Sequence, residues 1–248
     1  MDLLFYYMTQ KRIALKSSVL TFIFIIVNFI TIQASDSLSA YGIIQKYLNT
    51  IGGIDKLSSV QDRRTEMEGT VQKVKVSMVI YQKQPDKFKQ VIHAGEVEQE
   101  ILYSQDKGYV KINGKVSDIT GDELAKLKND ATLNLLVHLD TNNIHLTYLG
   151  IDTINGNPAY KILLKNSSLN WIHYYDTKSF LKVMDEKPVK AATGVYSQDT
   201  WYSDYRPVDG ILFPFKIKQK LGKQEMEFDV TSIKLNTGIT DEEFNSEE

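Results

Sequence analysis

The histidines of this sequence are not arranged to bind a metal ion. His93, His138, His145 and His173 lie far apart, and none belongs to an HxH or HExxH pattern. Metal sites in proteins combine closely spaced His, Cys and carboxylate ligands, and this chain has no cysteine. We therefore predict no metal site and no cofactor, and we expect each histidine to be an ordinary surface or strand residue.

Carboxylates offer the only other candidates for catalysis. Asp185 and Glu186, together with Asp204 and Asp209, could form an acid pair, but positions at strand ends and in turns explain them more simply. The sequence contains no GxSxG, Walker-type or GxGxxG motif. We therefore assign no catalytic residue and expect a protein that is not an enzyme. An enzyme whose site follows no recognisable motif is the alternative.

Composition excludes several classes of protein. The chain has 248 residues, of which 42% are hydrophobic and 24% charged, so it can bury a core and is not disordered throughout. Its formal net charge of −2 argues against a nucleic-acid partner held by a general positive field. The absence of cysteine excludes disulfides, thiol catalysis and a lipid-modified N-terminal cysteine.

The N-terminus has the pattern of an export signal. Basic Lys11, Arg12 and Lys16 precede the apolar stretch 19–32, which is short for a membrane anchor, and Ala34 follows as a small residue at the expected cleavage position. We predict a signal peptide over residues 1–34, cleavage near Ala34 and export to a bacterial periplasm. An uncleaved anchor is the alternative, and Met8 is a second candidate start.

Residues 35–248 are expected to form a single domain containing two main helices. Apolar residues at helical spacing predict the first over residues 38–51, ended by Gly52 and Gly53, with one further turn over 54–57. Thr120 and Glu123 have the spacing of a capping box, which predicts a second helix from Thr120 to about His138.

Strands account for most of the remaining chain. Alternating apolar and polar residues, separated by turn sequences such as Asn113-Gly114, predict about 11 strands. A sheet this long tends to curl, and the two helices are the only elements that can cover its concave face. The predicted class is mainly β (α+β), with one large, curved, antiparallel sheet.

The last two strands predict their own register. Lysines at 216, 218 and 220 alternate with apolar residues on one strand, and carboxylates at 225, 227 and 229 do so on the next. A loop over 221–224 pairs Lys220 with Glu225, Lys218 with Glu227, and Lys216 with Asp229. The same register places Ile217 opposite Phe228 and Phe215 opposite Val230 on the inner face.

The apolar face of the curved sheet is the candidate binding surface. Aromatic residues lie within the strand patterns, for example around Trp171 and Trp201, and either fill the core or line a pocket for an apolar ligand. We expect the strand 74–80 to face the concave side beneath the second helix. The predicted lipid-binding residues are Val74, Val76, Met78, Ile80, Leu124, Leu127, Phe213 and Phe215.

Four segments resemble one known family. They are the stretch from Tyr41 to Thr70, the segments 83–88 (KQPDKF) and 104–110 (SQDKGYV), the segment 202–215 (YSDYRPVDGILFPF), and the closing residues 241–244 (DEEF). In order and spacing they are similar to the motifs of LolA/LolB-like outer-membrane lipoprotein-sorting proteins. One departure is Gln84, which stands where the family has a basic residue before proline, while Lys83 lies one place earlier and so on the opposite face of a strand.

The resemblance implies a fold and a function. The implied fold is an unclosed antiparallel β half-barrel with helices over its concave face. The implied function is that of a monomeric, non-enzymatic periplasmic carrier, which shields lipid or lipoprotein acyl chains during outer-membrane lipoprotein sorting. Its partners would be these acyl chains and inner- or outer-membrane lipoprotein machinery. The alternative is a sensing or accessory binding module on the same scaffold.

Overall fold

A single antiparallel sheet of 13 strands dominates the computed structural model, which describes residues 38–191 and 194–245. The predicted signal peptide lies outside the described residues. The helical elements are α2 (Ala40–Ile51), α3 (Ile54–Ser59), α4 (Gly121–Ala131), η1 (Leu135–His138) and η2 (Asp241–Phe244). The strands are β1 (Asp62–Val71), β2 (Val74–Lys83), β3 (Lys87–Ala94), β4 (Val97–Ser104), β5 (Lys107–Ile112), β6 (Lys115–Ile119), β7 (His145–Ile154), β8 (Asn157–Lys165), β9 (Asn170–Asp176), β10 (Lys182–Ala191), β11 (Gly194–Val208), β12 (Ile211–Leu221) and β13 (Gln224–Leu235).

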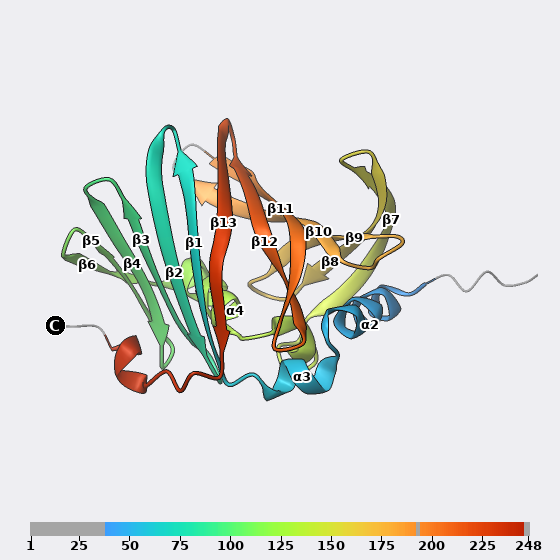
Figure 1. Cartoon of the computed structure of the whole chain (residues 1–248), viewed down its shortest axis with the longest axis horizontal. Helices are drawn as coiled ribbons and strands as arrows, with labels where there is room; N and C mark the ends of the chain where they lie inside the picture. The colour runs from blue at the N-terminus through green and yellow to red at the C-terminus, as the bar shows by residue number, and fades with distance from the viewer. Residues whose placement is uncertain (1–37, 192–193, 246–248) are drawn as a thin grey trace, which may run out of the picture. The chain divides into compact units, whose positions relative to one another are not determined.

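Strand order explains why α4 and η1 lie across one face of the sheet. The order is β6-β5-β4-β3-β2-β1-β13-β12-β11-β10-β9-β8-β7, so β1 to β6 run outward from the centre and β7 to β13 return from the opposite edge (Figure 1). The chain must therefore cross a face of the sheet between β6 and β7, and α4 and η1 form this crossing. The predicted unclosed antiparallel sheet is confirmed.

The main core lies between the helical elements and the strands near α2. Ile43 and Ile44 of α2 are fully buried and pack in one cluster with Ile162 and Leu164 of β8. Ser39 caps α2 by accepting a hydrogen bond from the backbone N–H of Gly42 (3.0 Å). Within the described residues, no helix combines the length and the apolar character needed to cross a bilayer.

Strand β1 corrects the predicted strand count. The sequence patterns gave about 11 strands, and the structure has 13. Apolar alternation alone did not predict strand β1, because Arg63, Arg64, Glu66 and Glu68 interrupt the alternation. It is nevertheless central, since it joins β2 to β13 and so connects the two halves of the sheet.

The second helix is also shorter than predicted. Residues expected to form one helix from Thr120 to His138 form α4, a turn and η1, because the backbone is extended at Thr132 (ψ 106°) and left-handed at Asn134 (φ 54°). The expected capping box is absent: the Thr120 side chain caps nothing, and Glu123 pairs instead with Lys126 (2.8 Å).

The hairpin register is confirmed for every charged pair. Lys216 lies opposite Asp229, Lys218 opposite Glu227 and Lys220 opposite Glu225, and Ile217 lies opposite Phe228. The strands continue one pair further than expected, to Leu221 and Gln224, so only Gly222 and Lys223 form the turn.

Charge reversal in this hairpin gives a prediction. The Lys218 ammonium lies 3.0 Å from Glu225 and 3.7 Å from Glu227. We expect Lys218→Glu to lower the melting temperature slightly, because it places three carboxylates together at an exposed site. Adding Glu225→Lys should restore more of the loss than adding Glu227→Lys, because Glu225 is closer. Calorimetry of the three variants measures this, and failure of both second changes would contradict the observed pairing.

Candidate functional site

A polar cavity lies between the helical cover and the sheet. It has a volume of about 260 Å³ and is lined by residues of α2, α3, α4, η1, β1, β2, β9, β10 and β11. Its charged and titratable side chains are Arg63, Asp130, His173, Lys182, Asp185 and Lys187, with the hydroxyls of Tyr47 and Tyr202. A core that merely filled space would be apolar here, so this lining marks the cavity as the candidate site.

Asp185 lies at the centre of the polar lining. It is 1% exposed, and its Oδ2 accepts hydrogen bonds from the Lys182 ammonium (3.0 Å) and the Tyr202 hydroxyl (2.7 Å). Burial alone would raise the pKa of Asp185, but the charges of Lys182 and Lys187 and the Tyr202 hydrogen bond bring it below its usual range. Asp185 is therefore ionised at neutral pH. The expectation that it lies at a strand end was wrong, since it faces inward from the interior of β10.

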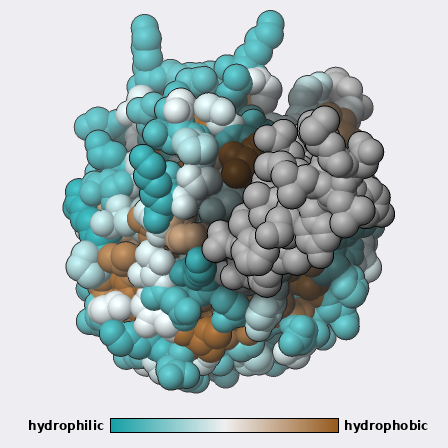
Figure 2. Space-filling view, turned by 90° about the vertical axis from the view of Figure 1, so that its right-hand side faces the viewer, coloured by the Kyte–Doolittle hydropathy of each residue, from teal (hydrophilic) through white to brown (hydrophobic). Residues whose placement is uncertain are grey.

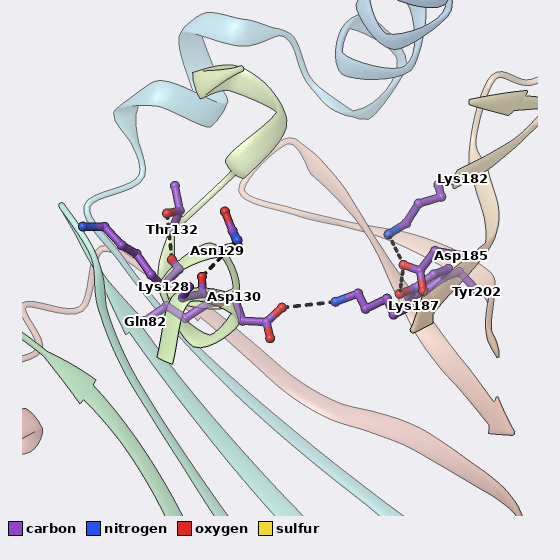
Figure 3. A network of polar contacts seen from close by, with 10 residues as sticks. Gln82, Lys128, Asn129, Asp130, Thr132, Lys182, Asp185, Lys187 and Tyr202 are labelled. Carbon is purple, nitrogen blue, oxygen red and sulfur yellow. Dashed lines mark hydrogen bonds and ion pairs between the residues drawn. The ribbon is translucent and has the colours of Figure 1, made fainter. Parts of the chain in front are cut away.

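Lys187 of β10 forms an ion pair with α4. Its ammonium lies 3.1 Å from Asp130 and 3.7 Å from the ring centroid of Trp171, a cation–π contact. Burial would lower the pKa of Lys187, but the carboxylates of Asp130 and Asp185 raise it. Figure 3 shows the ion pair crossing from α4 to β10, with the Gln82 amide donating a hydrogen bond to the backbone carbonyl of Asp130 (2.9 Å).

Arg63 brings a third cation to the cavity. Its Nε donates to Gln82 Oε1 (3.1 Å), a second guanidinium nitrogen contacts the same oxygen, and the group lies 5.6 Å from the ring centroid of Phe213. Burial lowers the pKa of Arg63 to about 10, which leaves it charged at neutral pH. No carboxylate among the described residues forms an ion pair with it.

His173 completes the lining from β9. It is 4% exposed, and its Nδ1 lies 2.9 Å from the Tyr175 hydroxyl. Burial, with the nearby charge of Lys182, holds the pKa of His173 well below its usual range, so the imidazole is neutral. Two buried atoms that line the cavity, His173 Nε2 and Asp185 Oδ1, have no hydrogen-bond partner within the protein.

The charges and hydrogen-bonding atoms of this lining are suited to binding. In the described part of the chain, no three His, Cys or carboxylate side chains gather as metal ligands. The cavity offers cations, a neutral imidazole and a carboxylate with one free oxygen, which suit an anion and a hydroxyl group.

The predicted lipid-binding residues lie near this cavity rather than in it. Val76, Met78 and Phe215 belong to a cluster of apolar side chains on the concave face, which Ile80 links to Leu124 and Leu127 of α4. Phe213 lies in the main core, beneath Arg63. Val74, at the far end of β2, is 44% exposed. Their role in lipid binding stays a prediction.

Lys83, two places before Pro85, lies elsewhere. The Lys83 ammonium binds the backbone carbonyl of Ile239 (2.7 Å) and Asp241 (2.7 Å), while the Gln84 amide donates to the carbonyl of Val60 (2.7 Å). Neither lines the cavity. Arg63, on the neighbouring strand, is the arginine that does.

Sequence reasoning missed the charged lining. Arg63, His173, Lys182, Asp185 and Lys187 come from three strands that the sequence does not visibly bring together. The one available signal was period two along β10, which places Asp185 and Lys187 on the same face.

Comparison with solved structures identifies the fold. A domain assigned as an outer membrane lipoprotein-sorting protein from Vibrio parahaemolyticus is similar over 83% of this chain and 95% of its own (10% identity, TM-score 0.54). A DUF1329 family protein from Desulfovibrio piger is similar over 83% and 95% (15% identity, TM-score 0.55), and a LolA superfamily protein from Nitrosomonas europaea over 85% and 99% (14% identity, TM-score 0.54). No protein-family model and no curated protein sequence matches the chain. The fold is LolA/LolB-like.

Proposed function

We propose that this LolA/LolB-like half-barrel is a periplasmic, non-enzymatic carrier that binds lipid or lipoprotein acyl chains, in outer-membrane lipoprotein sorting. The similarity in fold to a domain assigned to lipoprotein sorting supports the proposal. The signal peptide over residues 1–34 and a single lipid-binding domain over 35–248 are parts of the same proposal.

One observation carries it: an apolar cluster on the concave face whose members, among the described residues, all lie on strands. Its members come from β1, β2, β3, β12 and β13 only. In Figure 1 the helices lie over the lower ends of these strands, and the upper parts of β1, β2, β12 and β13 extend past them. We call this set the concave cluster: Met67, Val71, Val76, Met78, Ile80, Ile92, Ala94, Phe215, Ile217, Met226, Phe228, Val230 and Ile233.

The concave cluster suits acyl chains for energetic reasons. Each buried methylene group contributes about 0.8 kcal/mol, so an apolar surface alone gives useful affinity without any chemistry. The polar cavity, at about 260 Å³, is smaller than most sites for drug-sized ligands, which start at about 300 Å³. Acyl chains would therefore lie along the concave cluster and not inside the polar cavity alone.

A pair of substitutions on one strand tests the proposal. Met78 belongs to the concave cluster, and Val79, the next residue of β2, points to the opposite face. We expect Met78→Asp to reduce the lipid that native mass spectrometry detects on protein isolated from the periplasm, because a carboxylate among apolar side chains opposes burial of an acyl chain. Val79→Asp should retain it.

Two results would contradict the carrier. One is wild-type protein that carries no lipid and takes up none from added lipid, and the other is equal lipid loading of both variants. Unfolding midpoints of the two variants separate loss of binding from loss of the fold.

Cleavage of the proposed signal peptide can be tested directly. N-terminal sequencing of the protein from the native host should find a mature chain that begins at or near Ser35. An intact terminus at Met1 or Met8 in a membrane fraction would contradict a free periplasmic carrier.

A further inference from the structure

The polar cavity adjoins a second, more apolar groove. This groove has a volume of about 420 Å³ and runs along α4 between β4–β6 on one side and β10–β11 on the other. Its apolar lining comprises Ile101, Val110, Ile119, Leu127, Pro188 and Val189. Asp130, Trp171 and Lys187 line both spaces, so the Asp130–Lys187 ion pair is the boundary between them.

The charges around the polar cavity leave one cation unmatched. Lys182 pairs with Asp185 (3.0 Å) and Lys187 pairs with Asp130 (3.1 Å). Arg63 has only the Gln82 carbonyl oxygen and the face of Phe213. Arg63 is half-buried, and a guanidinium that is partly removed from water is stabilised by an anion, so an occupant with a single negative charge would balance the lining.

The two atoms without a hydrogen-bond partner, His173 Nε2 and Asp185 Oδ1, set a second requirement for the occupant of the cavity. The pKa of Tyr175 is raised by burial, so its hydroxyl keeps its proton and can donate to Nδ1 of His173. In that tautomer Nε2 of His173 carries the proton and is a buried donor without a partner in the protein. Asp185 Oδ1 remains as an acceptor. A group that accepts one hydrogen bond and donates another, such as a hydroxyl, satisfies both.

We propose that the polar cavity and the adjoining groove form one site for an amphiphile whose headgroup is a singly charged oxyanion. The oxyanion binds the guanidinium of Arg63, and a neighbouring hydroxyl group reaches His173 and Asp185. The acyl chain passes the Asp130–Lys187 pair into the groove beside Leu127, which Ile80 connects to the concave cluster. This site rests on the proposed acyl-chain binding and specifies the headgroup. A carboxylate and a phosphodiester both supply a single negative charge.

Isothermal titration of the purified mature chain tests the headgroup. The anionic probes are decanoate and dihexanoyl phosphatidylglycerol, their uncharged counterparts are decanol and dihexanoylglycerol, and inorganic phosphate is the free anion. We expect each anionic amphiphile to bind at least about tenfold more tightly than its uncharged counterpart, because a charge-assisted hydrogen bond is worth that much or more. The tighter of the two anionic probes identifies the source of the oxyanion.

Two adjacent arginines provide the variant and its control. Arg63 faces the cavity, whereas Arg64 lies over the ring of Tyr81 and pairs with Glu66. Arg63→Gln should reduce the preference for anionic probes to less than about threefold and leave the affinity for uncharged probes unchanged. Arg64→Gln should keep the full preference.

The other possible results of the titrations would each contradict one part of the proposal. Equal binding of anionic and uncharged probes by the wild type, or an unchanged preference in Arg63→Gln, rejects the oxyanion headgroup and leaves the acyl-chain carrier intact. Phosphate binding as tight as that of the amphiphiles means a site for a free anion only. Failure of every amphiphile to bind rejects the proposed function together with this site. The comparison of anionic with uncharged probes on the wild-type protein tests the oxyanion headgroup even if Arg63→Gln does not fold.

Discussion

Replacing Asp185 with asparagine is expected to lower the free energy of unfolding by about 3 kcal/mol at pH 7, the lower end of the range for breaking a buried ion pair. The change leaves the Lys182 ammonium without its carboxylate and removes an opposite charge from Lys187. Asparagine keeps an oxygen for the Tyr202 hydroxyl, so the loss reports mainly on charge.

The pH dependence follows from the lowered pKa of Asp185. An aspartate has a pKa of about 3.9 in an unfolded chain, and in the folded protein the pKa is lower. Its contribution to stability is therefore complete above about pH 4 and is lost as the pH falls towards the folded-state pKa. We expect the difference between wild type and Asp185→Asn to shrink below about pH 4.

Urea denaturation at pH 7, 5 and 3 measures both effects. Asp152→Asn is the matched control, because Asp152 also pairs with a lysine, Lys161 at 3.2 Å, but at an exposed position on β7. It should leave the midpoint nearly unchanged. A difference for Asp185→Asn that is below about 1 kcal/mol, or independent of pH, would mean that Asp185 is not a buried charge.

Period-two alternation made much of the sheet predictable. Strands such as β2, β12 and β13 place apolar residues on one face, and the hairpin between β12 and β13 also aligns opposite charges. The alternation pattern did not predict strand β1, because its side chains are largely charged or polar on both faces. Arg63 lines the cavity, and Arg64 lies on the convex side. Position in the centre of the sheet, rather than its own pattern, makes it a strand.

The helix that covers the groove shows a different limit. Leu135 continues the helical spacing of Leu124 and Leu127, so the pattern favoured one long helix. The left-handed Asn134 ends that spacing, and its amide donates to the backbone carbonyl of Leu57 in α3 (2.6 Å). A tertiary contact therefore accompanies the break, and such contacts are not visible in local spacing.

The charged cavity could not be assembled from the sequence. Arg63 and Asp185 are more than a hundred residues apart, and their proximity depends on the pairing of β1 with β13, which no turn between them specifies. Each residue alone is an ordinary strand charge. Apolar residues at the edge strand were equally hard to place: Tyr148, Leu149 and Ile151 of β7 stay exposed. Figure 2, viewed from the side where Figure 1 places β7, shows polar and apolar residues interspersed on that face.

The pairing of β1 with β13 leads to the second large effect, which is expected for Gly69→Ala. Gly69 lies opposite Phe228 in the register of β1 with β13. A Cβ atom at position 69 would lie well inside contact distance of the Glu227 carbonyl oxygen and 2.7 Å from Cδ1 of Phe228. Because the oxygen belongs to the backbone of a paired strand, it cannot rotate away. We expect a loss of about 3 kcal/mol in the free energy of unfolding, at the upper end of the usual cost of overpacking.

A matched glycine and a double mutant identify the cause of this loss. Gly42→Ala adds the same methyl group in α2, where its nearest neighbour is Ser39 Oγ at 3.2 Å, and should be neutral or slightly stabilising because alanine favours helices. If the Glu227 carbonyl is the obstacle, combining Gly69→Ala with Phe228→Leu gives additive losses in urea denaturation. Rescue by Phe228→Leu would place the obstacle in the aromatic ring instead. A Gly69→Ala protein as stable as the wild type would mean that β1 and β13 are not held this closely, and the junction between the two halves of the half-barrel would then be looser than the register implies.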